Sequence, residues 1–239
     1  MANQAINFFY IFFFSFLPVL GWFWFILKED PHPEPRSLTA LSFLLGGVAV
    51  FLSFYAELSL EQFGLSSHTA PFLYYFYSSV IEEVFKFLPI ALFIFTRRAF
   101  DEPIDAMVYM GFAALGFSFL ENFFGLYTLA SSSVTLVMVV ALMRALSANF
   151  LHMLASVLIG FGFAESLKLR RVLPFVFSII VAILLHFIYN MYIVEQDAML
   201  YVFPILWAVF FIVLKEFDFI KARSLPRHTS KQLPSEHSF

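Results

Sequence analysis

The sequence predicts an all-α membrane protein, a polytopic bundle of about seven transmembrane helices, from its composition, its low charge and the length of its apolar runs. Apolar residues make up 61% of the 239 positions, charged residues make up 13%, and phenylalanine alone occurs 36 times. A soluble domain would carry about 25% charge. The apolar runs have helical length and lack the alternation, over roughly ten residues, that marks the strands of a membrane barrel. A lipid bilayer is therefore the expected environment, and no nucleic-acid partner is expected.

Seven apolar runs of helical length are expected to cross the hydrocarbon core, which is roughly 30 Å thick. They are residues 6–27, 38–55, 71–96, 104–129, 134–164, 172–194 and 199–214. The first run lacks a basic n-region and a small-residue cleavage site, so it is expected to be a retained helix. The charged, proline-dense connection over residues 28–36 is either a plain stiff turn or a functional element. The second run leads through a polar stretch to Pro71, which opens the third.

Charged or polar loops bound the later runs. Arg97 and Arg98 close the third run, and Pro103 precedes the fourth, whose glycines permit close helix contact. The fifth run follows a serine triplet and is long enough to tilt or break. The short basic loop at residues 165–171 precedes the sixth run, and the seventh is purely apolar. Residues 1–215 are thus predicted to form the helical bundle, and residues 216–239 a polar, disordered cytoplasmic tail.

The basic residues predict the orientation of the chain. Of the fourteen, all but Lys86 and Arg144 fall in the first, third and fifth loops or in the tail. These places share one side of the membrane if there are seven spans. By the positive-inside rule that side is cytoplasmic, so the N-terminus is expected outside and the C-terminus in the cytoplasm. The chain is therefore predicted to be a multi-pass protein of the cell membrane, inner or plasma.

Four consecutive spans carry ionisable groups where a bilayer helix is normally apolar. Placing a charged side chain at the centre of such a helix costs roughly 2.5–3.5 kcal/mol. The groups are Glu82, Glu83 and Lys86, then Glu121, then Arg144 and His152, and then His186. At about 1.5 Å per residue, one acid or imidazole from each span lies ~20–25 Å from the cytoplasmic end of its helix. These four, which we expect to meet around a polar cavity, are Glu83, Glu121, His152 and His186.

Spacing within the third span indicates different roles for its two carboxylates. Glu82 and Lys86 are four residues apart and share a helix face, whereas Glu83 points about 100° away. We expect Lys86 to neutralise Glu82 and to leave Glu83 facing the cavity, although Lys86 could also reach Glu83. Lys86 and Arg144 are expected to act as counter-ions.

Carboxylates and imidazoles at one depth suit general-base activation of water, with or without a metal. Asn190 shares a face with His186 and could donate to a developing oxyanion. In the metal-dependent version, a zinc ion with an open position for water would be bound by Glu83, Glu121, His152 and His186. No His-Glu-x-x-His spacing supports this version, and the chain has no cysteine ligand. Metal-free chemistry therefore stays open beside it.

Two hypotheses from other classes compete with an enzyme. The same carboxylates and imidazoles could relay protons or metal ions in a transporter, or could pair only with one another in a non-catalytic scaffold that holds a partner membrane protein. Transmembrane polar contacts average only about 0.6 kcal/mol, which is small beside the insertion cost and favours a functional site. A transporter often has paired repeats, and none is evident in this sequence.

Several motifs, in this order, resemble the PrsW family of intramembrane proteases, which is related to the CAAX-type prenyl endopeptidases. They are the Asp30-Pro31-His32-Pro33-Glu34-Pro35 turn, Glu82-Glu83-x-x-Lys86, Glu102-Pro103-Ile104-Asp105 through Tyr109-x-Gly111, Gly116-Phe117 through Glu121-Asn122, His152 with Gly160, and His186-x-x-x-Asn190. The resemblance implies a membrane endopeptidase that cleaves membrane proteins such as anti-sigma factors. It places Glu82 and Glu83 in the first catalytic motif, Glu121 in the second, His152 in the third, and His186 with Asn190 in the last.

Two positions depart from the related prenyl endopeptidases. Lys86 stands where their first motif has an arginine one position later, and Glu121 stands where their second motif has a histidine. These departures argue against a CAAX-type substrate. Lys86, Asn122 and Arg144 are predicted to support the catalytic groups, and the choice between glutamate-type and zinc-dependent hydrolysis stays open.

Overall fold

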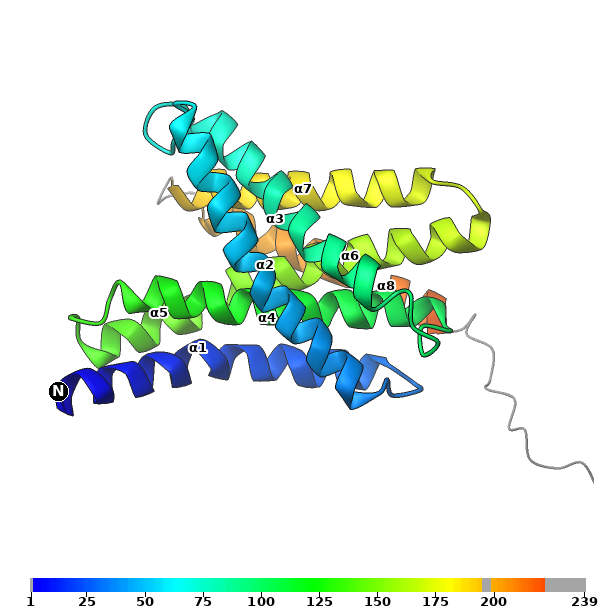
Figure 1. The fold of residues 1–239 in the computed structure, drawn as a ribbon, viewed down its shortest axis with the longest axis horizontal. Helices are drawn as coiled ribbons and strands as arrows, with labels where there is room; N and C mark the ends of the chain where they lie inside the picture. Colours follow the sequence, from blue (N-terminus) through cyan, green and yellow to red (C-terminus); the bar gives the residue numbers. More distant parts are fainter. Residues whose placement is uncertain (1, 195–198, 222–239) are drawn as a thin grey trace, which may run out of the picture.

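The computed structural model describes residues 2–194 and 199–221, and every regular element in these ranges is an α-helix. The helices are α1 (Ala2–Glu29), α2 (Arg36–Gln62), α3 (Pro71–Phe93), α4 (Pro103–Tyr127), α5 (Val134–Leu146), α6 (Ala148–Leu169), α7 (Leu173–Val194) and α8 (Met199–Lys221) (Figure 1). The predicted all-helical class is confirmed. Within the described part of the chain, five segments are long and apolar enough to cross a membrane, namely Phe8–Glu29, Arg36–Gln62, Pro103–Tyr127, Val134–Leu169 and Leu173–Tyr192.

The C-terminal helix extends beyond the predicted bundle. α8 continues to Lys221, past the predicted boundary at residue 215. The rest of the predicted tail, residues 222–239, lies outside the described residues. The count of seven spans and the orientation of the chain stay predictions.

The fifth predicted run is two helices, because the chain bends at Ser147. This residue has a φ of −121° and a ψ of −81°, which is not helical. Its hydroxyl donates to the Met143 carbonyl oxygen at 2.7 Å and accepts from the Tyr189 hydroxyl on α7 at 3.0 Å. With 13 residues, α5 reaches only ~20 Å and is too short to cross a bilayer alone. The bend frees α6 to follow its own direction and to pack against both α4 and α7.

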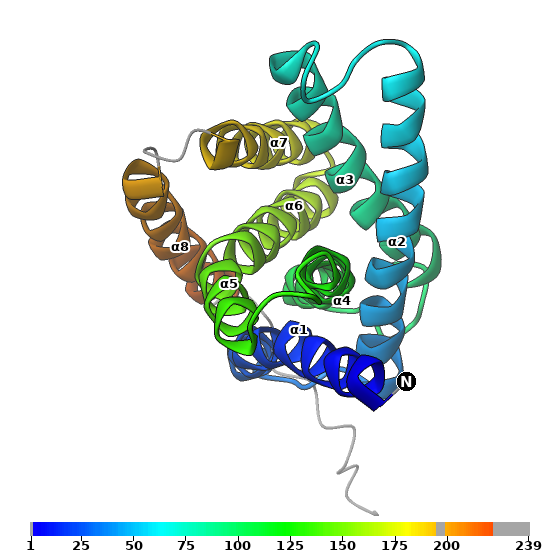
Figure 2. The same cartoon turned by 90° about the vertical axis from the view of Figure 1, so that its left-hand side faces the viewer.

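α4 is the central helix, with α1, α2 and α6 packed around it (Figure 2). Its residues 104–118 are all buried. Small residues allow this burial because neighbouring backbones can approach closely. A Cβ on Gly116 would lie 1.8 Å from the carbonyl oxygen of Phe43, and one on Gly46 would lie 1.8 Å from that of Ala113. α2 and α4 are therefore in backbone contact at these two glycines.

This backbone contact predicts a stability difference between two glycines of α4. Gly116→Ala should destabilise the protein by about 1–3 kcal/mol, because the added methyl group forces α2 away from α4. Gly125→Ala is the matched control, since a Cβ there meets nothing within 4 Å. It should be neutral or stabilising by up to ~1 kcal/mol, because alanine is the better helix former. Equal thermal unfolding of the two variants in detergent would contradict the close contact.

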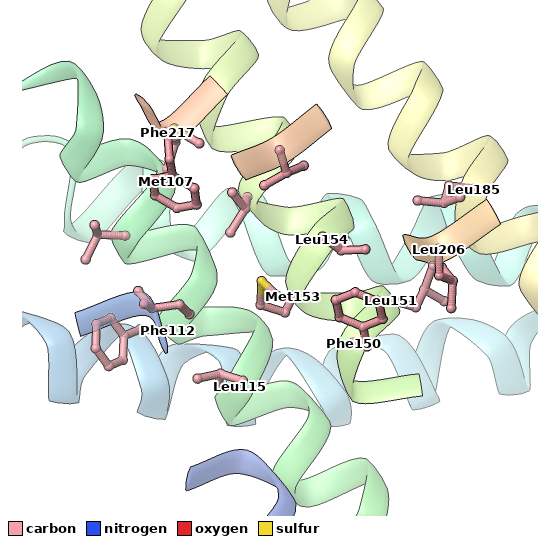
Figure 3. Close-up of a cluster of buried hydrophobic side chains, with 14 of the residues drawn as sticks. Met107, Phe112, Leu115, Phe150, Leu151, Met153, Leu154, Leu185, Leu206 and Phe217 are labelled. Carbon is pink, nitrogen blue, oxygen red and sulfur yellow. The ribbon is translucent and has the colours of Figure 1, made fainter. Parts of the chain in front are cut away.

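The apolar core lies between α4 and α6, with α1, α7 and α8 closing it (Figure 3). Trp22 of α1 stacks on Phe150 of α6 with ring centroids 4.6 Å apart, and its indole N–H donates to the Ala145 carbonyl oxygen at 3.0 Å. Large apolar side chains also cover the exterior: Phe63 is 83% exposed and Phe177 is 67% exposed. An exterior of this kind is suited to contact with lipid.

The connection between α1 and α2 is tied to the N-terminal part of α4. Asp30 accepts hydrogen bonds from the backbone N–H groups of His32 at 2.9 Å and Glu34 at 3.2 Å, and burial raises the pKa of this carboxyl group. The Tyr109 hydroxyl donates to Glu34, and His32 Nδ1 lies 3.1 Å from Glu102 Oε2. The proline-dense segment is thus an anchoring turn that joins three helices.

Candidate active site

α3 carries the first candidates, Glu82, Glu83 and Lys86, on a helix that packs against α2, α4 and α7. The side chains of Glu83 and Lys86 are 0% exposed, whereas that of Glu82 is 14% exposed. Helical spacing puts Lys86 within reach of both carboxylates. The two carboxylates therefore differ in burial, although both lie within reach of the same ammonium group.

Lys86 binds Glu83 more closely than Glu82, contrary to the expectation from the sequence. Its Nζ lies 2.7 Å from Glu83 Oε1 and 3.9 Å from Glu82 Oε2. It also donates to His152 Nδ1 at 2.9 Å and lies 4.4 Å from the centre of the Phe117 ring. A helix permits pairs at either spacing, so these contacts from α4 and α6 decide which carboxylate the ammonium group joins. Glu82 is the less constrained of the two.

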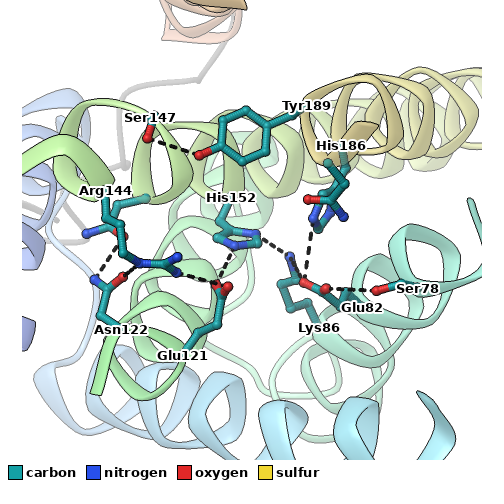
Figure 4. A network of polar contacts seen from close by, with 12 residues as sticks. Ser78, Glu82, Lys86, Glu121, Asn122, Arg144, Ser147, His152, His186 and Tyr189 are labelled. Atoms are coloured by element: carbon teal, nitrogen blue, oxygen red, sulfur yellow. Dashed lines mark hydrogen bonds and ion pairs between the residues drawn. The ribbon is translucent and has the colours of Figure 1, made fainter. Parts of the chain in front are cut away.

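His152 bridges the ammonium group and Glu121 (Figure 4). Because an ammonium group can only donate, His152 Nδ1 must accept, and its Nε2–H donates to Glu121 Oε2 at 2.7 Å. Glu121 Oε1 pairs with Arg144 Nη2 at 2.9 Å, and Arg144 Nε donates to Asn122 Oδ1 at 2.6 Å. Lys86 and Arg144, the predicted counter-ions, thus both pair with carboxylates.

His186 of α7 completes the cluster. Its Nδ1 donates to Glu83 Oε1 at 2.8 Å, which leaves Nε2 with a lone pair 3.6 Å from Glu82 Oε2. Within the described ranges, Glu82 Oε2 has no hydrogen-bond partner. With the imidazole neutral and the Glu82 carboxylate ionised, both of these atoms are hydrogen-bond acceptors. Such a pair is suited to bind a water molecule, which can donate to both, or a cation.

A divalent metal suits part of this arrangement. Glu82, His152 and His186 each offer one ligand atom, and these atoms lie within 4.8 Å of one another. Two ligands bound at ~2.1 Å to a tetrahedral zinc ion lie ~3.4 Å apart, close to the separation of the Glu82 and His186 atoms. The carboxylate of Glu83 on His186 Nδ1 is a typical second contact of a metal-binding imidazole. His152 would have to release Glu121 in order to bind with Nε2.

The carboxylates of the ligand set expected from the sequence are therefore revised. Glu83 is held by Lys86 and His186, and Glu121 is held by Arg144 and His152. The set that the geometry brings together contains Glu82 in place of both.

Asn190 follows His186 by one helical turn, as expected. Its Nδ2 donates to Ser79 Oγ on α3 at 3.3 Å, which is a long hydrogen bond. The amide group is therefore held near α3 by a weak contact, and its role toward an oxyanion stays a prediction.

Sequence reasoning assigned no role to three polar residues that contact the cluster. Ser78 Oγ lies 2.7 Å from Glu57 Oε1 on α2 and 3.3 Å from Glu82 Oε1, and Asn149 Oδ1 accepts from Asn122 Nδ2 at 2.9 Å. Ser78 precedes Glu82 by four residues, a spacing that predicts contact on one helix face. The contacts of Glu57 and Asn149 depend on how helices cross, for which the sequence has no direct signal.

A family model and individual known proteins give the same result when they are compared with this chain. Residues 34–215 match the family described as "PrsW family intramembrane metalloprotease". The protein named Protease PrsW of Geobacillus kaustophilus is 30% identical over 177 residues, which cover 73% of this chain and 75% of that protein. Protease PrsW of Bacillus subtilis is 30% identical over 170 residues (70% and 74%), and that of Clostridioides difficile is 24% identical over 228 residues (92% and 93%). No solved structure matches the chain.

Proposed function

This chain belongs to the PrsW family of intramembrane metalloproteases and is a multi-pass membrane protein that hydrolyses peptide bonds. We propose that it cleaves membrane-protein substrates with water activated at Glu82. The observation that supports this proposal most is the pair formed by Glu82 Oε2 and His186 Nε2, 3.6 Å apart. Both atoms can accept a hydrogen bond, and both lie inside an apolar helical bundle. Water that donates to both atoms would keep its oxygen lone pairs free to attack a peptide carbonyl carbon.

In the proposed reaction the water donates its hydrogens to Glu82 and His186. As its oxygen attacks the peptide carbonyl carbon, Glu82 takes one proton. Asn190 leaves Ser79 and donates to the developing oxyanion. Glu82 then returns the proton to the leaving nitrogen, the C–N bond breaks, and the other product ends in a new carboxyl group.

The remaining polar residues hold the imidazoles in place. Glu83 fixes the tautomer of His186, and Lys86 with Glu121 fixes that of His152. A divalent metal, if bound by Glu82, His152 and His186, would supply Lewis acidity toward the water. Without a metal, Glu82 contacts the water directly; with a metal, Glu82 would contact the ion that binds the water.

The substrate class follows from the family resemblance. We expect a single-span membrane protein of the anti-sigma-factor kind, cut in the cell membrane by the bundle of residues 1–215. Purified protein should therefore cleave candidate single-span substrates in detergent or lipid. Loss of cleavage with a chelator, and its return with zinc, would assign the metal-dependent version; unchanged cleavage would assign the glutamate-type version. If none of the substrates is cut under either condition, the proposed function is wrong.

The proposed topology has seven spans, with the N-terminus outside and the C-terminus cytoplasmic. Because the natural chain has no cysteine, single cysteines can be introduced without background labelling. Ser66 lies between α2 and α3, and Lys168 lies in the last turn of α6. Ser66→Cys should react with an impermeant reagent from outside, and Lys168→Cys only after the cytoplasmic face is opened. Reaction of both from one side would contradict the orientation.

A further inference from the structure

Ser78 uses its hydroxyl group differently from the helical serines that bond to their own backbone. Serine within a helix commonly donates to the carbonyl oxygen four residues earlier. Ser42 and Ser79 do so, at 2.9 Å and 2.8 Å. Ser78 instead has one hydroxyl hydrogen for two carboxylates, since its Oγ lies 2.7 Å from Glu57 Oε1 and 3.3 Å from Glu82 Oε1 (Figure 4 shows the contact with Glu82). The hydrogen is shared between them, and the shorter bond is to Glu57. Ser78 is buried, with 5% of the residue exposed.

Glu57 lies at the end of a buried helix face that is otherwise uncharged. It lies one turn after Ser53 and so continues the buried face of α2 that includes Gly46 and Val50. Its neighbours Tyr55 and Leu58 are exposed, whereas Glu57 is partly buried. An inward carboxylate is costly in a membrane helix, so its presence at this position indicates a function. The contact that it makes is with Ser78.

We propose that Glu57 and Ser78 are positioning residues of the active site, in which Glu57 orients the Ser78 hydroxyl and Ser78 restrains the Glu82 carboxylate. The inference rests on the proposed function of Glu82. The longer, 3.3 Å branch of the shared Ser78 hydrogen bond is made to Oε1 of Glu82, so it holds that oxygen on the α2 side and leaves Oε2 directed at His186. Without Glu57, the hydroxyl is free to turn to its own helix backbone, as in Ser79. Without Ser78, the Glu82 carboxylate can rotate away from the water.

The test is steady-state cleavage of a single-span substrate by the full-length protein. Ser78→Ala should lower kcat by about 10–100-fold, because a small misplacement of a reacting group has effects of this size. KM should change by less than about 2-fold, since substrate binding is not altered. Ser78→Thr, which keeps the hydroxyl, should restore most of the activity. Ser42→Ala is the matched control, because Ser42 is a buried helical serine whose contact is with its own helix.

Glu57 should act only through Ser78. Glu57→Ala should lower kcat, whereas Glu57→Gln should retain most activity because its amide oxygen still accepts from Ser78. The double variant Glu57→Ala/Ser78→Ala should be no slower than Ser78→Ala alone, since coupled residues are not additive. Glu61→Gln, on the exposed surface one turn further along α2, is the control for Glu57.

The outcomes separate this inference from the proposed function. If wild type cleaves and Ser78→Ala cleaves equally well, the positioning role is wrong and the function of Glu82 stands. Additive losses in the double variant, or a loss in Ser78→Ala that follows its thermal unfolding and that threonine does not restore, would likewise overturn it. If wild type cleaves no substrate, the proposed function fails and this inference fails with it.

Discussion

Glu82→Gln is expected to abolish detectable cleavage, because a positioned general base contributes about 10²–10⁴-fold to the rate. Glutamine has the shape of glutamate but cannot take a proton from water, and it is a poor metal ligand. The structure singles out Glu82 because its Oε2 faces His186 Nε2 at 3.6 Å, whereas Glu83 is already held by Lys86 and His186. The loss should therefore occur in either the metal-free or the metal-dependent version.

The cleavage rates of the variant and of wild type must be compared at equal concentrations of folded protein. Glu82 is partly exposed, so its change to glutamine should leave expression and thermal stability near those of wild type. Glu83→Gln should also lose activity, but through displacement of Lys86 and His186 and with lower stability. Glu61→Gln, on the exposed surface of α2, should cleave like wild type. Full proteolysis by both Glu82→Gln and Glu83→Gln would refute the mechanism.

Lys86→Met should lower the free energy of unfolding by about 3–5 kcal/mol, because removal of one partner leaves the other charge buried and uncompensated. Lys86 is 0% exposed and contacts Glu83, His152 and the ring of Phe117. Its loss removes the only cation within 3 Å of Glu83 Oε1 among the described residues.

A second variant separates charge from packing. In Lys86→Met/Glu83→Gln the buried charge is gone, so most of the lost stability should return. Lys168→Met, on the exposed end of α6, should change stability by no more than about 0.5 kcal/mol. Unfolding in mixed detergent micelles measures all three. A double variant as unstable as Lys86→Met would show that packing of the lysine chain, and not its charge, is what the bundle needs.

The helices could be predicted from the sequence because charged, polar or proline-containing segments separate the apolar runs. The bend at Ser147 could not, since Leu146, Ser147 and Ala148 contain no proline or glycine and the bend depends on contacts with Tyr189. The sequence predicts that the fifth run tilts or breaks, but it does not predict the residue at which the break occurs.

The sequence indicated which acids and imidazoles could meet but not how they pair. Equal distance along four helices brought acids and imidazoles to one level, because helical rise is nearly constant. The choice of Lys86 between Glu82 and Glu83 could not be predicted, since both spacings allow a contact and side chains from α4 and α6 decide it. The contact of Glu57 likewise arises from the crossing of α2 and α3, which periodicity does not determine.

The most direct test of the account is product analysis in proteoliposomes that contain the purified protein and a single-span substrate. The reaction is run in water enriched in heavy oxygen, and proton and metal flux are recorded in the same vesicles. We expect two fragments from a cut within the apolar span of the substrate, with heavy oxygen in the newly formed carboxyl group. With Glu82→Gln we expect no fragments. Intact substrate together with proton or metal movement would contradict the account and would replace the protease by a transporter.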